Sequence, residues 1–135
     1  MLTADQLLKE GETFIEDYNI EIARWTNTHW TSTVPPLYAI LTDYRLILQP
    51  HTRKRYEPAI IPTSYVTNVV RLNTDRNGVM LYLKTGHRIG LFVTADPQQT
   101  LLHNLQQRKL PKRKVHFDGE FDAATVRRII EFLAS

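Results

Sequence analysis

The stretch Leu37-Tyr-Ala-Ile-Leu-Thr-Asp-Tyr-Arg-Leu-Ile-Leu-Gln49 contains two apolar runs on either side of a short polar segment, Thr42-Asp-Tyr-Arg45. A polar turn of this length lets the two runs fold back on each other with their apolar side chains on one core face. The stretch therefore predicts a β-hairpin with its turn at Thr42–Arg45.

Further along the chain, Asn77-Gly78 supplies the two positive-φ positions that a type I′ turn requires. Apolar residues then alternate with other residues along Val79–Leu83 and again along Ile89–Val93, with Thr85-Gly86 as a turn between them. This alternation predicts an antiparallel meander that begins at Asn77-Gly78.

The regions on either side of the first hairpin predict further strands. Thr13–Thr26 alternates as a long strand does, whereas Thr26–Pro36 is rich in Thr and ends in two prolines, which predicts a loop. Ala59–Leu72 is expected to form one strand that Pro62 interrupts. One face of that strand would hold three apolar side chains, those of Val66, Val70 and Leu72.

Helical patterns lie at both ends of the chain. A short helix is expected to start at Thr3 and stop at Gly11, and another to start at Asp96-Pro97 and run to about Lys109. Asp122 is expected to cap a last helix, whose apolar stripe is formed by Val126, Ile129, Ile130 and Leu133. The predicted fold is α+β and mainly β: an antiparallel sheet or barrel of six to seven strands closed by an amphipathic helix, plus an additional terminal helix.

Length and composition are those of one globular domain, with 135 residues, 42% hydrophobic and 23% charged. The absence of cysteine excludes a disulfide framework, a cysteine zinc site and a thiol nucleophile. No apolar run approaches the roughly 20 residues that span a bilayer, and Met1–Glu16 does not resemble a signal peptide. We therefore expect a cytoplasmic domain.

The net charge of +3 is unevenly distributed along the chain. Residues 1–23 hold one basic and six acidic residues, residues 24–117 hold fourteen and four, and residues 118–135 hold two and four. The middle therefore carries +10 between ends of −5 and −2. This distribution indicates either complementary segments within the domain or a basic face directed at a polyanion.

In its order of elements the chain resembles the pleckstrin-homology (PH) superfold, and more narrowly the GRAM and bacterial PH-like domains. The resemblance rests on Gly11-Glu12 before the first strand, on the Leu37–Gln49 hairpin and on Ile61-Pro62. It covers about residues 8–109 and implies a single PH-like domain over residues 1–135, in which residues 111–135 form a linker and an extra helix. It also implies a binding module for a phosphoinositide or membrane surface, for a protein partner or for further copies of itself.

PH domains that hold inositol phosphates usually place Lys and Arg on their first two strands and on the loop between them. Here that loop, about Thr26–Val34, contains neither residue, and only Arg24 precedes it. The resemblance therefore does not lead us to expect a high-affinity headgroup site in this loop.

Two basic clusters are candidates for anion or lipid binding. The first is Arg53-Lys54-Arg55 with His51 beside it, and the second is Lys112-Arg113-Lys114. The alternative for the first is a charged loop that keeps the sheet end soluble, and for the second a helix C-terminus whose cations oppose the helix dipole.

No catalytic residue, metal or cofactor is expected. The five histidines lack ligand spacing, no serine lies in a strand–turn–helix elbow, and the chain has no glycine-rich phosphate loop. Binding of nucleic acid is not favoured, because Tyr38, Tyr44, Tyr65 and Tyr82 fall within apolar strands.

The leading hypothesis is a non-catalytic PH/GRAM-like module that binds an anionic membrane surface or lipid headgroup weakly, in the cytoplasm and at the membrane periphery. The alternative is a protein-interaction or homo-oligomerisation module without a lipid role. In that alternative the stripe Val126, Ile129, Ile130 and Leu133 would form an interaction helix.

Overall fold

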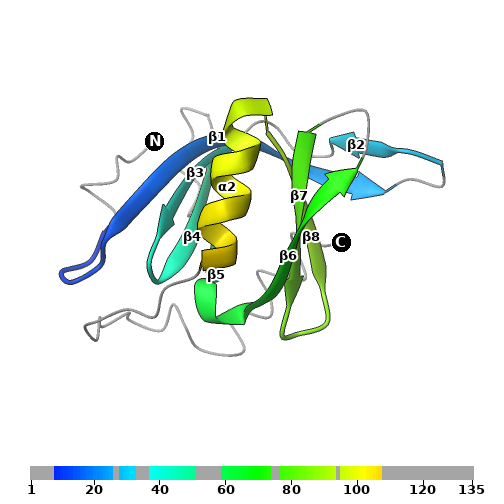
Figure 1. The fold of residues 1–135 in the computed structure, drawn as a ribbon. Helices are drawn as coiled ribbons and strands as arrows, with labels where there is room; N and C mark the ends of the chain where they lie inside the picture. The colour runs from blue at the N-terminus through cyan, green and yellow to red at the C-terminus, as the bar shows by residue number, and fades with distance from the viewer. Residues whose placement is uncertain are drawn as a thin grey trace.

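The computed structural model describes residues 8–25, 28–32, 37–50, 59–73, 77–93 and 95–107. Within these ranges the strands are β1 (Phe14–Trp25), β2 (Trp30–Ser32), β3 (Leu37–Thr42), β4 (Arg45–Pro50), β5 (Ala59–Pro62), β6 (Val66–Asn73), β7 (Asn77–Leu83) and β8 (Arg88–Phe92). A 3-10 turn, η1 (Thr63–Tyr65), joins β5 to β6, and the helix α2 (Ala95–Gln107) follows β8 (Figure 1).

All strand pairings are antiparallel, in the order β5-β4-β3-β1-β8-β7-β6, with β2 attached to β1. The long strand β1 belongs to both halves, because Phe14–Ile20 pairs with β3 and Glu21–Ala23 pairs with β8. The sheet is not closed, since β5 and β6 form its two edges. Figure 1 shows α2 lying across the space between the two halves, where it packs on β6, β7 and β1.

The predicted fold class is confirmed: a mainly β antiparallel sheet with a helix after it. Two short strands raise the strand number above the prediction. The predicted loop Thr26–Pro36 contains β2, and the single strand expected over Ala59–Leu72 is two strands, β5 and β6, on opposite edges of the sheet. Pro62 ends β5 and η1 turns the chain, as a proline without a ladder donor allows.

The core lies between the two halves and α2. It contains the inward side chains of the predicted hairpin and meander, together with two leucines of α2: Leu41, Leu46, Leu48, Val79, Leu81, Leu83, Ile89, Leu91, Leu101 and Leu105. Gln98 fastens α2 to the sheet, because its Nε2 donates to the Gly78 carbonyl oxygen at 2.8 Å. The alternation that predicted these strands is therefore the alternation that fills the core.

Two details of β6 and β7 differ from the sequence prediction. A register shift between Val66 and Asn68 moves Val69 into the core and leaves Val70 exposed, so Val66, Val70 and Leu72 do not share a face. Asn77-Gly78 is not the turn, because Asn77 pairs with Asn73 and Gly78 pairs with Leu72 as the first residues of β7. The connection, residues 74–76, lies outside the described residues.

Candidate functional site

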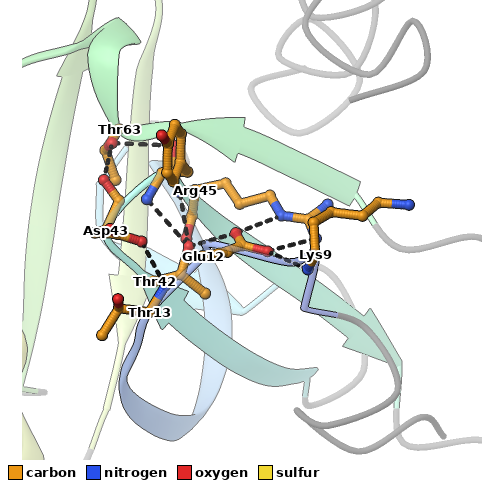
Figure 2. A network of polar contacts seen from close by, with 8 residues as sticks. Lys9, Glu12, Thr13, Thr42, Asp43, Arg45 and Thr63 are labelled. Atoms are coloured by element: carbon orange, nitrogen blue, oxygen red, sulfur yellow. Dashed lines mark hydrogen bonds and ion pairs between the residues drawn. The ribbon is translucent and has the colours of Figure 1, made fainter. Parts of the chain in front are cut away.

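A buried ion pair lies where β1 begins and β3 turns into β4. Arg45, the first residue of β4, donates from Nε to Glu12 Oε2 at 2.8 Å and from Nη2 to Glu12 Oε1 at 2.9 Å. The side chains are 2% and 0% exposed, respectively. Two parallel hydrogen bonds between a guanidinium and a carboxylate fix both distance and orientation (Figure 2).

Two further donors complete the environment of the Glu12 carboxylate. Thr42 Oγ1 donates to Oε2 at 2.6 Å, and the Lys9 amide donates to Oε1 at 3.0 Å. Gly11 has a φ of 87°, a value that favours glycine. The Glu12 amide donates a hydrogen bond to the Lys9 carbonyl oxygen at 3.0 Å. Each carboxylate oxygen of Glu12 therefore accepts two hydrogen bonds, and together these four bonds use all four lone-pair sites of the group.

The same cluster joins three segments of the chain. Thr13 and Asp43 exchange two hydrogen bonds: the Thr13 amide donates to Asp43 Oδ1 at 2.8 Å, and the Asp43 amide donates to the Thr13 carbonyl oxygen at 3.1 Å. The Thr63 amide of η1 donates to the Tyr44 carbonyl oxygen at 2.8 Å. Figure 2 shows these contacts around the β3–β4 turn. We call Lys9, Glu12, Thr42, Asp43, Arg45 and Thr63 the polar clamp.

Sequence reasoning identified the parts of the polar clamp but not their contact. Gly11-Glu12 and the hairpin that contains Thr42 and Arg45 were separate carriers of the PH resemblance, and the structure brings them together. One signal was present in the sequence. Arg45 directly precedes the apolar run Leu46–Leu48, and an arginine buried in such a strand needs a charged partner.

The polar clamp sets the ionisation of Glu12. Burial by itself would raise the pKa of this carboxyl, but hydrogen bonds from Arg45, Thr42 and the Lys9 amide, with the charge of Arg45, hold the pKa below its usual value. The ionised form is therefore favoured in the folded protein.

We expect the stabilisation from this carboxylate to be present above the unfolded-state pKa of about 4.3 and to be lost as the pH falls through the lower folded-state pKa. The free energy of unfolding should thus fall more steeply between about pH 5 and pH 3 for the wild type than for Glu12→Gln. Urea unfolding at a series of pH values measures both slopes, and parallel slopes would contradict the role given to Glu12.

The side chains of the polar clamp hold the three segments together, and its buried ion pair leaves no group free to act on a substrate. Neither oxygen of Glu12 has a lone-pair site left for a substrate proton, and Arg45 is fully covered. Within the described ranges, no group of three or more His, Cys, Asp or Glu could hold a metal ion. No helix in those ranges is long and apolar enough to cross a membrane.

The predicted binding residues fall outside the described part of the chain. These are His51, Arg53, Lys54 and Arg55, the cluster Lys112, Arg113 and Lys114, and the stripe Val126, Ile129, Ile130 and Leu133. The structure does place the attachment points of the first cluster. Residues 51–58 connect Pro50 at the end of β4 to Ala59 at the start of β5, and these two strands are neighbours in the sheet.

Because β4 starts at Arg45 in the polar clamp and ends at Pro50, the strand ends that flank residues 51–58, Pro50 and Ala59, lie at the sheet end opposite the polar clamp. At that end Pro50 pairs with Leu37, the first residue of β3. We call residues 51–58 the basic connection.

Comparison with known proteins rests on structure. No protein-family model and no curated protein sequence matches the chain. The human ARAP2 N-terminal PH domain superposes with a TM-score of 0.52 at 12% identity, covering 81% of this chain and 90% of that domain. The chain has a PH-like fold.

Other solved structures agree with this PH-like fold. The linker-DH/PH fragment of p115-RhoGEF gives a TM-score of 0.56 at 10% identity over 72% of this chain. The chain spans only 29% of the length of that protein. A C-terminal domain of an unknown protein from Leishmania infantum gives 0.52 at 15% identity, covering 73% of this chain and 85% of that domain. At such identities the likeness concerns the fold.

Proposed function

We propose that the PH-like domain is a non-catalytic binding module that attaches weakly to an anionic membrane surface through Arg53, Lys54 and Arg55, assisted by His51. The observation that supports the proposal is that Arg53-Lys54-Arg55 falls, in the sequence, between Pro50 and Ala59, which end and begin two neighbouring strands at the sheet end opposite the polar clamp. The resemblance to GRAM and bacterial PH-like domains supports the same function, in the cytoplasm and at the membrane periphery.

The strength of the proposed membrane attachment depends on the number of basic side chains and on the salt concentration. Near an anionic membrane each basic side chain contributes on the order of 1 kcal/mol, and salt screens the attraction. Three cations support transient attachment at physiological salt. Lys112, Arg113 and Lys114 would add to the attachment if they face the same surface.

Vesicle sedimentation tests the proposal. Binding should require anionic lipid, should weaken as salt rises, and should drop roughly 100-fold when Arg53, Lys54 and Arg55 are changed to Glu. A matched control reverses three exposed cations of the described strands and turns, Arg71, Lys84 and Arg88, with the same change in net charge. Equal losses in both triple variants, or equal binding to neutral vesicles, would reject a site in the basic connection.

The alternative function is binding of a protein partner or of a second copy. It is favoured by Phe14 and Ile15, adjacent large apolar side chains at the start of β1 that are 43% and 39% exposed. Some PH-like neighbours occur in complexes with a protein, as the DH/PH domain of human ARHGEF11 does with human RhoA at a TM-score of 0.54 and 14% identity. Light scattering after size exclusion tests self-association: a dimer that Phe14→Ser and Ile15→Ser abolish supports the alternative, and a monomer at high concentration counts against the second copy.

A further inference from the structure

The outer face of the β3–β4–β5 half has an apolar centre. Ile40 pairs with Ile47, and Ile47 pairs with Ile60, so the three isoleucines form a row across the strands. Their neighbours Leu41, Leu46 and Ile61 point to the opposite face, into the core. The row nevertheless has exposures of 0% for Ile40, 0% for Ile47 and 8% for Ile60.

Within the described ranges, no helix or strand has extensive contacts that would place it as a second layer over this row. α2 packs on β6, β7 and β1, and the extensive contacts of β4 are with β3, β5 and η1. Neither apolar cluster within the described ranges contains any of the three isoleucines. An aliphatic side chain on the outer face of a sheet reaches zero exposure only beneath another layer. Of the described loop residues, Glu12 reaches this face at its Arg45 end, two residues before Ile47 on the same side of β4. The extensive contacts between described elements do not account for a cover over the rest of the row.

Three longer segments lie outside those ranges: 1–7, 51–58 and 108–135. Residues 51–58 contain no aliphatic side chain of the Val, Leu, Ile or Met type. Residues 1–7 contain three, Met1, Leu2 and Leu7, but these do not follow the i, i+3, i+4 and i+7 spacing of an apolar helix stripe. Residues 122–133 instead combine an Asp cap with an apolar stripe at the i, i+3, i+4 and i+7 positions, namely Val126, Ile129, Ile130 and Leu133.

Reach and charge also suit this segment. Residues 108–121 can extend over about 45 Å after α2 ends at Gln107, enough to pass from α2 to the outer face. Asp17 is the β1 partner of Ile40 in the register, so a carboxylate lies beside the isoleucine row. Arg127 and Arg128 lie next to the apolar stripe in the sequence and carry the complementary charge.

We propose that the C-terminal helix, residues 122–133, docks on the outer face of β3, β4 and β5 and covers Ile40, Ile47 and Ile60 within the same molecule. The helix forms an additional layer of the domain, with its stripe facing the isoleucine row. The stripe is then occupied and is not available as an interaction helix for other molecules.

Methyl NMR on the full chain tests the docking directly. With selective labelling of the isoleucine δ1 methyls, assigned through single Ile→Val variants, we expect nuclear Overhauser contacts from Ile129 or Ile130 to Ile40, Ile47 or Ile60. A mixed sample of labelled and unlabelled chains shows whether the contacts lie within one molecule. Ile89, which lies in the core, is the internal control.

Contacts that persist on dilution and are absent between chains support the proposal. It is overturned if Ile129 and Ile130 show no contact to the isoleucine row, if they contact other methyls instead, or if the contacts arise only between chains. A second measurement uses Ile129→Val, a variant expected to fold. It should shift the methyl resonances of Ile40, Ile47 or Ile60 and leave that of Ile89 in place, and the reverse pattern would also overturn the proposal.

Discussion

Glu12→Ala is expected to lower the free energy of unfolding by about 3–5 kcal/mol. The substitution leaves the Arg45 guanidinium buried without its carboxylate and removes the acceptor that Thr42 and the Lys9 amide use. A loss of this size is a large share of the stability of a small domain. Urea unfolding at pH 7 measures it.

A double-mutant cycle measures how much of this loss comes from the interaction between Glu12 and Arg45 itself. Arg45→Ala should cost a similar amount, and the double variant should cost clearly less than the sum, because no buried charge is then left alone. Glu10→Ala is the matched control, since Glu10 is an exposed acid two residues away and its loss should change stability by no more than about 0.5 kcal/mol. Additive single effects would show that Glu12 and Arg45 do not act as a pair.

Gly78→Ala is expected to destabilise the protein by about 1–3 kcal/mol through overpacking. A Cβ at this position would lie 2.6 Å from the Leu91 carbonyl oxygen, 3.1 Å from Leu72 Cδ2 and 3.2 Å from Phe92 Cδ1. The nearest of these atoms belongs to the backbone of β8, which is fixed by its pairing with β7. Thermal or urea unfolding measures the loss.

Asn77→Thr distinguishes the strand from the turn that the sequence suggested. Asn77 is exposed and paired in β7, so a β-branched residue should fit there with a change within about 0.5 kcal/mol. In a type I′ turn the same residue would need positive φ, at a cost of roughly 1–2 kcal/mol. A loss of that size for Asn77→Thr would contradict the strand assignment.

Local patterns predicted most of the sheet. The hairpin at Thr42–Arg45 and the alternation over Val79–Leu83 and Ile89–Val93 are correct, because each depends on neighbouring residues and on one buried face. The helix after β8 was also predicted, and it begins at Ala95 rather than at the expected cap Asp96.

The sequence predictions fail where the local structure depends on residues far away in the chain. The register shift near Val66 and the position of Gly78 depend on the partner strands β7 and β8, which no local pattern reports. The ion pair between Glu12 and Arg45 joins residues 33 positions apart and depends on the turn at Gly11. The basic residues of the proposed site are visible in the sequence, whereas only the fold shows that Pro50 and Ala59, on either side of the first cluster in the sequence, belong to neighbouring strands.

The central claim is that an anionic surface binds at the basic connection. An NMR titration of the isotope-labelled full chain with bicelles of rising anionic lipid content tests it most directly. We predict that the largest chemical-shift changes occur in residues 51–58 and their neighbours Gln49 and Ala59, grow with anionic lipid and shrink with salt, while Gly11 and Thr13 at the polar clamp stay unchanged. Changes centred on any other surface, or none with anionic bicelles, would contradict the claim.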